Sequence, residues 1–222
     1  MTGGLFYFCR VVKINPHQLI LPTAYLPPVA WFHFLMKYET VLIEQHETYP
    51  RQTYRNRCEI LTEKRVMPLS VPVTKVHGNH TKSRDILLNF SEPWPRNHWR
   101  AICAAYQNSP YFLYYRDALH QQMSKSHSNL LEFNRELILL LCEWLDINKD
   151  FRYTESYARY PDDSIDLRNM TPKQKWYKGK LSRYIQVFSE RHEFAENLSI
   201  IDLLFNLGPD AAGYLKECKI EV

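Results

Sequence analysis

The sequence predicts a single α/β domain with a central sheet flanked by helices, and three observations lead to this fold class. Short apolar runs alternate with segments whose apolar residues recur every three or four positions. Prolines and polar clusters separate these segments, as turns do. The length of 222 residues suits one well-packed domain. Alternating strands and helices are typical of α/β domains, but they do not specify the strand order.

The first half of the chain supplies the predicted strands. Each is a short apolar run bounded by turn residues, and a continuous run such as "TVLIEQH" indicates a buried strand. The strand candidates are 19–21, 40–46, 69–73 and 85–90. Pro72 places the third candidate at a sheet edge or a bulge. Between the first two, we expect a helix from about Pro28 to Lys37, because proline is favoured in a first helical turn.

The second half is mainly helical. Apolar residues at three- and four-residue spacing predict a series of helices, and Gly208 is the expected stop of the fourth. The predicted helices are 95–106, 111–123, 128–145, 197–208 and 209–215. Residues 148–180 are polar and irregular, which is typical of a long loop or lid.

Composition narrows the class of protein. The net charge of +4 is too small to make nucleic acid the default partner, although a local basic patch could still bind phosphate. Five scattered cysteines, without a CxxC pair, favour free thiols in a reducing cytoplasm. The start "MTGGLFYFCR" lacks the form of a signal peptide, and the densest later apolar run is too short for a membrane span. We therefore expect a soluble, cytoplasmic protein.

The strand candidate at 40–46 carries a possible acid/base pair. Period-2 alternation places Glu44 and His46 on one face, at the carboxyl end of the strand, where α/β domains tend to form their sites. Histidine titrates near neutrality, and a carboxylate could orient or charge it. The alternative is that both residues simply lie where the strand leaves the core.

The stretch "YPRQTYRNRCEI" (49–60) concentrates anion-binding capacity. Arg51, Arg55 and Arg57 stand among amide and tyrosine side chains, and guanidinium suits phosphate or carboxylate. If the stretch is extended, Arg55 and Arg57 leave one face about 7 Å apart, a span suited to a diphosphate. Arg55→Ala should then weaken binding with little effect on folding. The alternative is a set of structural ion pairs, for which the melting temperature would collapse.

A third candidate is His98, in the first turn of a predicted helix, where free N–H groups favour anions. The alternative is a buried histidine packed between Trp94 and Trp99. The glycine-rich phosphate loops, HExxH and GxSxG are absent, and "MSKS" (123–126) lacks the partner motif that a synthetase would need. We therefore expect no cofactor and no metal.

Three blocks together resemble the WbqC-like protein family, in the compact form typical of Bacteroidetes. They are "ETYPRQTYRNRCEI" (47–60), "WPRNHWRAICAAYQNSPYFLYY" (94–115) and "NLSIIDLLFNLGPDA" (197–211), and "LPTAYLPPVAWF" (21–32) resembles the family's usual start. The resemblance covers Leu19–Leu215, so we divide the chain into a peripheral extension, 1–18, and a WbqC-like domain, 19–222. Arg51 departs from the family pattern, in which a lysine is common at that position.

The resemblance implies a cytoplasmic transferase of O-antigen, lipopolysaccharide or other surface-polysaccharide synthesis, with glycine or aminoacyl transfer to a sugar. The matching polar residues are Glu47, Tyr49, Gln52, Tyr54, Arg55, Asn56, Arg57, Trp94, His98, Trp99, Tyr106, Ser199, Asp202 and Asn206. The expected ligand is a sugar phosphate or nucleotide sugar. Two alternatives stay open: a nucleotide-sugar-binding protein without chemistry, and an RNA-binding module.

We combine these inferences into one candidate site. The predicted catalytic residues are Glu44, His46, Glu47 and His98. The predicted substrate-binding residues are Tyr25, Tyr49, Arg51, Gln52, Tyr54, Arg55, Asn56, Arg57, Trp94 and Trp99. Either histidine would serve as the base for the attacking hydroxyl or amine, with Arg55 and Asn56 as donors to the developing oxyanion. Asp202 is expected to be structural, facing outward or capping a neighbouring element. The sequence does not specify the sugar, the donor or the oligomeric state.

Overall fold

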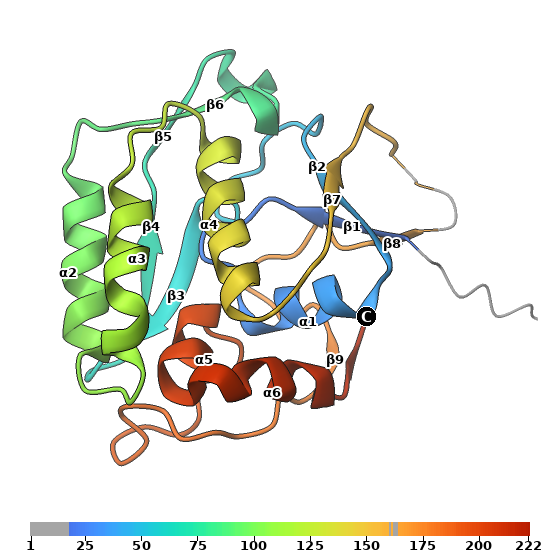
Figure 1. The fold of residues 1–222 in the computed structure, drawn as a ribbon. Coiled ribbons are helices and arrows are strands. Elements are labelled where there is room, and N and C mark those ends of the chain that lie inside the picture. The colour runs from blue at the N-terminus through green and yellow to red at the C-terminus, as the bar shows by residue number, and fades with distance from the viewer. Residues whose placement is uncertain (1–17, 160, 162–163) are drawn as a thin grey trace, which may run out of the picture.

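The computed structural model describes residues 18–159, 161 and 164–222 and has a parallel four-stranded sheet at its centre (Figure 1). The strand order is β7-β2-β1-β8, and every neighbouring pair is parallel. These strands are β1 (Gln18–Pro22), β2 (Thr40–Glu44), β7 (Phe151–Tyr153) and β8 (Ser164–Asp166). Helices flank the sheet, so the predicted α/β class with one central sheet is confirmed.

Helix α1 (Val29–Lys37) connects β1 to β2 and begins after Pro28, as the sequence predicts. It is mostly apolar, and its residues from Val29 to Leu35, His33 included, are buried, which is the pattern of a core helix. At its end the Lys149 ammonium donates to the carbonyls of Leu35 (3.0 Å), Met36 (2.8 Å) and Tyr38. The last turn of this helix therefore has a charged cap from a distant part of the chain.

The two faces of the sheet differ. Alternation along the strands places Leu19, Leu21, Val41 and Ile43 on one face, and all four are at most 3% exposed. The other face carries, among others, Gln18, Ile20, Thr40, Leu42 and Glu44. There the parallel register pairs Ile20 with Leu42, and Leu42 with Arg152 of β7. This second face is the one that borders the cleft described below.

Three helices, α2 (Trp94–Tyr106), α3 (Phe112–Ser124) and α4 (Leu130–Trp144), stand side by side in Figure 1. The ring of Phe205, on α5 (Ile200–Leu207), packs edge-on against Tyr106 of α2 (5.2 Å) and Phe112 of α3 (5.3 Å). Gly208 ends α5 with φ of +55°, and a Cβ there would lie 2.5 Å from the Tyr111 ring. The predicted glycine stop is therefore confirmed. Helix α6 (Ala211–Glu217) follows.

The remaining strands form two-stranded antiparallel pairs. They are β3 (Arg57–Leu61) with β4 (Val66–Ser70), β5 (Val73–Lys75) with β6 (Ile86–Leu88), and β9 (Lys178–Gly179) with β10 (Ile220–Glu221). Short 3₁₀ turns lie at η1 (Gly78–His80), η2 (Ser83–Asp85) and η3 (Gly208–Asp210). The predicted strand 69–73 is wrong as a unit, because the chain leaves β4 at Ser70 and β5 starts only after Pro72. Proline lacks the N–H that a continuous ladder would need.

The interpretation of residues 148–180 as a loop or lid is also wrong in part. That segment supplies β7 and β8, the two edge strands of the central sheet, and β9. Strands of two or three residues are too short to show a period in sequence. The expectation that residues 1–18 are peripheral falls almost entirely on 1–17, outside the described residues, and Gln18 opens β1. Within the described part of the chain, no helix is long and apolar enough to cross a membrane.

Candidate functional site

Two buried arginine–carboxylate pairs lie at the carboxyl ends of the sheet strands. Glu44 is the last residue of β2, and Arg168 comes two residues after β8. Glu47 and Arg55 belong to the loop that follows β2. Because α/β domains bind ligands beyond the carboxyl ends of their parallel strands, a ligand site is expected at this edge of the sheet.

Glu44 is 1% exposed and held by three donors. Its Oε1 accepts from the His46 N–H (2.6 Å) and the Thr154 hydroxyl (2.9 Å), and its Oε2 accepts from Arg168 Nη1 (3.0 Å). All three partners donate, so both oxygens of this buried side chain have hydrogen-bond partners. The side chain is therefore fixed in one orientation at the end of β2.

Arg168 joins β8 to β2. Its Nε and Nη2 donate to the two oxygens of Asp166 (2.9 and 2.8 Å) while Nη1 reaches Glu44, and the Tyr157 ring lies 5.0 Å from the guanidinium carbon. Burial raises the pKa of Asp166, but the hydrogen bonds and charge of Arg168 outweigh burial and leave that pKa below its ordinary value. The guanidinium charge is thus balanced by two carboxylates.

Arg55 and Glu47 form the second pair. Arg55 is fully buried and donates from Nε and Nη2 to the two Glu47 oxygens (2.7 and 2.8 Å), a bidentate geometry. The Ser83 hydroxyl also donates to Glu47 (3.0 Å). Arg55 Nη2 donates in addition to the carbonyl of Arg168 (2.8 Å), which connects the two pairs. The loop after β2 is therefore tied to the segment after β8.

Unused hydrogen-bonding capacity surrounds this network. Among the described residues, Arg55 Nη1, Asn134 Oδ1 and the Tyr49 hydroxyl have no hydrogen-bond partner although they are buried. Asn134 itself donates to the Arg55 carbonyl (2.7 Å) and to Thr23 (3.2 Å). Burial raises the pKa of Tyr49; the charge of Arg55 opposes this shift, and the charge of Glu47 adds to it. A water molecule or a polar group of a ligand would satisfy such atoms.

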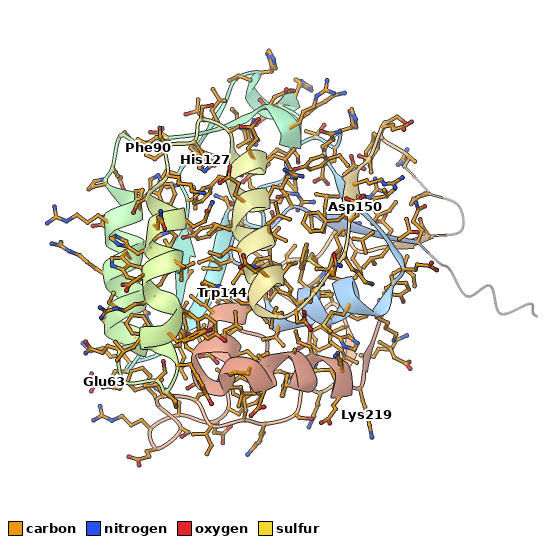
Figure 2. The ribbon with its side chains drawn as sticks, in the orientation of Figure 1. Glu63, Phe90, His127, Trp144, Asp150 and Lys219 are labelled. Atoms are coloured by element: carbon orange, nitrogen blue, oxygen red, sulfur yellow. The ribbon has the colours of Figure 1, made fainter. Side chains whose placement is uncertain are left out.

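A cleft of about 490 Å³ opens beside the network, over the second face of the sheet. Ile20 and Leu42 are its apolar residues from the two central strands, and Glu44 lies at its strand-end side. Arg152 and Glu155 contribute opposite charges. The Arg152 side chain is 78% exposed and meets only Asp150, at 3.6 Å, among the described residues; Figure 2 shows Asp150 just before β7. The volume of the cleft is in the range of small-ligand pockets.

The arginine stretch does not form the diphosphate-spanning strand that an extended chain would give. Residues 51–56 are turns and bends, and β3 begins only at Arg57. Arg57 is half-buried and pairs with Glu59 (3.1 Å), and the Asn56 amide donates to the Val71 carbonyl. Arg51 and Gln52 are exposed. Tyr49 and Tyr54 are buried, and burial raises the pKa of Tyr54 to about 12.

His98 belongs to a separate, aromatic cluster. Its Nδ1 lies 3.0 Å from the Tyr25 hydroxyl, and the rings of Tyr25 and Trp94 lie 5.7 and 5.3 Å from it. Burial lowers the pKa of His98 to about 4, although hydrogen bonding to the backbone of Ser70 opposes the shift. The histidine is therefore neutral at pH 7. Trp99 lies elsewhere, stacked on His120 at 4.5 Å.

His46 is the predicted base that stays partly open to solvent. Its Nδ1 lies 3.2 Å from Arg84 Nη1. Because guanidinium only donates, Nδ1 accepts in this contact, and the neutral ring carries its hydrogen on Nε2. The Arg84 side chain is 45% exposed, so this contact can be exchanged for one to a ligand.

Sequence reasoning missed Arg168, Asp166, Thr154, Ser83 and Asn134. The signal for the first two was "SIDLR" (164–168), in which two apolar residues alternate with three polar ones and the last two polar residues are a possible ion pair. Asp202, expected to face outward or to cap a neighbouring element, is fully buried and accepts from Tyr184 (2.6 Å) and Gln186 (2.9 Å). No group of three or more metal-ligating side chains occurs among the residues that the structure describes.

Comparison with known proteins places the chain in a family. Residues 23–184, more than half of the chain, match the WbqC-like protein family, and the chain therefore belongs to it. A relative, "Uncharacterized protein Rv1507c" of Mycobacterium tuberculosis (strain ATCC 25618 / H37Rv), is 26% identical over 226 residues, covering 90% of this chain and 97% of that protein. No solved structure matches.

Proposed function

We propose that the protein is a transferase of surface-polysaccharide synthesis. Its proposed substrate, a sugar phosphate or nucleotide sugar, binds in the cleft beside Glu44. The observation that carries this proposal is that the cleft runs along the second face of the sheet, from Gln18 and Thr40 to the carboxyl end of β2, where it meets the Glu44 carboxylate with its fixed geometry. Family membership supports it through the resemblance described above. Transfer of a glycine or other aminoacyl group to a sugar is the reaction that this resemblance implies.

The proposed roles of the residues are argued from their contacts. Arg55 and Arg168 hold Glu47 and Glu44 in place, so we assign all four to positioning rather than to direct phosphate binding. Arg152, the exposed cation at the cleft, is the proposed phosphate contact. The apolar side chains of Ile20 and Leu42 would pack against the sugar or base ring of the ligand.

His46 is the proposed general base. His46 and Arg84 are not among the residues that line the cleft, but His46 lies two residues beyond Glu44 and its N–H donates to the Glu44 carboxylate. A ligand that extends from the cleft past Glu44 and displaces Arg84 would free the Nδ1 lone pair to take a proton from the attacking hydroxyl or amine. The Nε2–H would remain as a donor. His98 is less suited to this role, because a pKa of about 4 makes it a weak base and Tyr25 occupies its Nδ1. A His46→Gln variant should keep ligand affinity and lose transfer.

Calorimetric titration with UDP-glucose tests the binding step. Arg152→Ala should weaken binding about ten-fold or more, since a charge-assisted bond contributes roughly 1.5–3 kcal/mol. Arg116→Ala is the matched control, because Arg116 is also an exposed arginine beside an aspartate but lies on α3. Equal affinity of the Arg152→Ala variant and the control would refute the assignment of phosphate to this cleft.

Salt dependence separates the alternatives. Binding of one or two phosphates should weaken modestly between low and physiological salt, whereas an RNA-binding surface should lose affinity steeply. A non-catalytic binding protein would bind UDP-glucose with the same affinity in the wild-type and His46→Gln forms and would transfer nothing in either. Screening of aminoacyl donors with the bound sugar decides between that outcome and transfer.

A further inference from the structure

A second cavity, of about 250 Å³, lies where the start of α2, the end of α3 and the start of α4 meet. We call it the aromatic cavity and define it by Leu88, Phe90, Trp94, Met123 and Phe133, with residues 124–126 at its rim. None of these residues lines the cleft beside Glu44. In Figure 2, Phe90 and His127 mark this end of the helices, and Trp144 marks the other end of α4. We propose that the aromatic cavity binds a small aromatic acid.

The walls of the cavity suit one aromatic ring. Trp94 is 3% exposed; Phe90 stacks on it at 5.8 Å and Phe133 meets it edge-on at 5.7 Å. Aromatic pairs favour these offset and edge-on arrangements, and a ligand ring would extend them. An apolar cavity of about 150 Å³ already holds a benzene molecule, so this one has room for a ring with a substituent.

The rim supplies the polar end. Lys125 follows the carboxyl end of α3, and its side chain is 50% exposed with Nζ 3.3 Å from Glu136. Two serine hydroxyls flank it, at 124 and 126. Helix α2 begins at Trp94 with no acidic residue in its first turn and no side-chain cap, so its partial positive charge lies at the cavity and offsets the partial negative charge of the α3 carboxyl end. The Lys125 ammonium and the two hydroxyls therefore favour a carboxylate.

The walls argue against a sugar in this cavity. The hydroxyls of a sugar need several polar partners, and the five wall residues offer one polar group, the indole N–H of Trp94. Among the described residues, that buried N–H has no hydrogen-bond partner. A ligand with one polar end and an apolar ring matches both the walls and the rim.

Calorimetric titration with benzoate, benzyl alcohol and glucuronate tests the proposal. Benzoate should bind saturably with a dissociation constant on the order of 1 mM, as expected for so few atoms. Phe90→Ala should weaken benzoate binding about five-fold, because it removes half of the stacked aromatic pair. Lys125→Gln should weaken it about ten-fold and leave benzyl alcohol binding unchanged. Both side chains are at least half exposed, so both variants should fold.

Two matched controls complete the experiment. Tyr114→Ala removes an exposed aromatic side chain of α3, and Lys180→Gln removes an exposed lysine, both outside the cavity lining. Neither should change benzoate affinity. Absence of saturable benzoate binding, tighter binding of glucuronate or benzyl alcohol, or equal affinities of cavity and control variants would each overturn the proposal.

Discussion

Arg55 has two possible roles when only the sequence is known: phosphate binding, or a structural ion pair. In sequence it belongs to an arginine-rich stretch that suits phosphate, but in the fold it is buried with its guanidinium on Glu47. Loss of Arg55 would leave the melting temperature unchanged only if its side chain faced solvent. Because the side chain is fully buried, we expect the melting temperature to fall. Glu47 lies only eight residues away, yet local sequence could not predict the pairing, because a non-periodic loop does not reveal which side chains turn inward.

Arg55→Ala should lower the free energy of unfolding by about 3–5 kcal/mol, since it leaves the buried Glu47 carboxylate without its charged partner. Arg57→Ala is the control within the same stretch. Its pair with Glu59 is partly exposed, so the loss should stay below about 1 kcal/mol. Urea unfolding of the two variants makes the comparison. Similar losses in both would show that the buried pair does not stabilise the fold as we infer.

Asp202 gives a pH-dependent prediction. Burial raises its pKa above the ordinary value of 3.8, although hydrogen bonds from Tyr184 and Gln186 oppose the shift. A raised folded-state pKa means that the folded state is penalised as pH rises above the unfolded pKa and through the folded one. Asp202→Asn keeps an acceptor for both donors and cannot ionise. Its melting temperature relative to wild type should therefore increase between pH 4 and pH 8, and a constant difference would contradict this.

At the scale of elements, the helices were the most predictable part of the fold. A long apolar stripe such as that of α4 fixes both the element and its buried face, and the observed Leu130–Trp144 lies within the predicted 128–145. The edge strands β7 and β8 have three residues each and no such period. Their place in the sheet depends on pairing with β2 and β1, more than 100 residues earlier, which a single sequence does not show.

The Lys149 cap at the end of α1 gives a prediction about the stability of one element. Lys149 donates to three backbone carbonyls at the end of the helix, which are otherwise unsatisfied in its last turn. Lys149→Met keeps much of the apolar stem and removes the donors, so the free energy of unfolding should fall by about 1.5–3 kcal/mol. Lys180→Met, at an exposed position, should change it by less than about 0.5 kcal/mol. Equal effects in urea unfolding would show that the cap contributes nothing.

At the scale of the whole molecule, the site is where distant segments meet. Glu44 was predicted from the alternation of its strand, Arg55 from the arginine-rich stretch, and Glu47 from the resemblance to the WbqC-like family. Arg168 and Asn134, which hold them, come from segments about 80 to 125 residues further along the chain. Sequence reasoning thus located one side of the candidate site, and the fold supplied the other.

A last prediction concerns the start of the domain. A chain shortened to begin at Leu19 keeps every β1 residue except Gln18, and the central register from Leu19–Val41 to Pro22–Glu44 stays intact. The buried core residues Leu19 and Leu21 stay in the shortened chain. We therefore expect the shortened chain to melt within about 2 °C of the full chain, the shift for a loss below about 1 kcal/mol. Differential scanning calorimetry of the two chains measures it, and a shift of about 10 °C or more would mean that the preceding residues complete the fold.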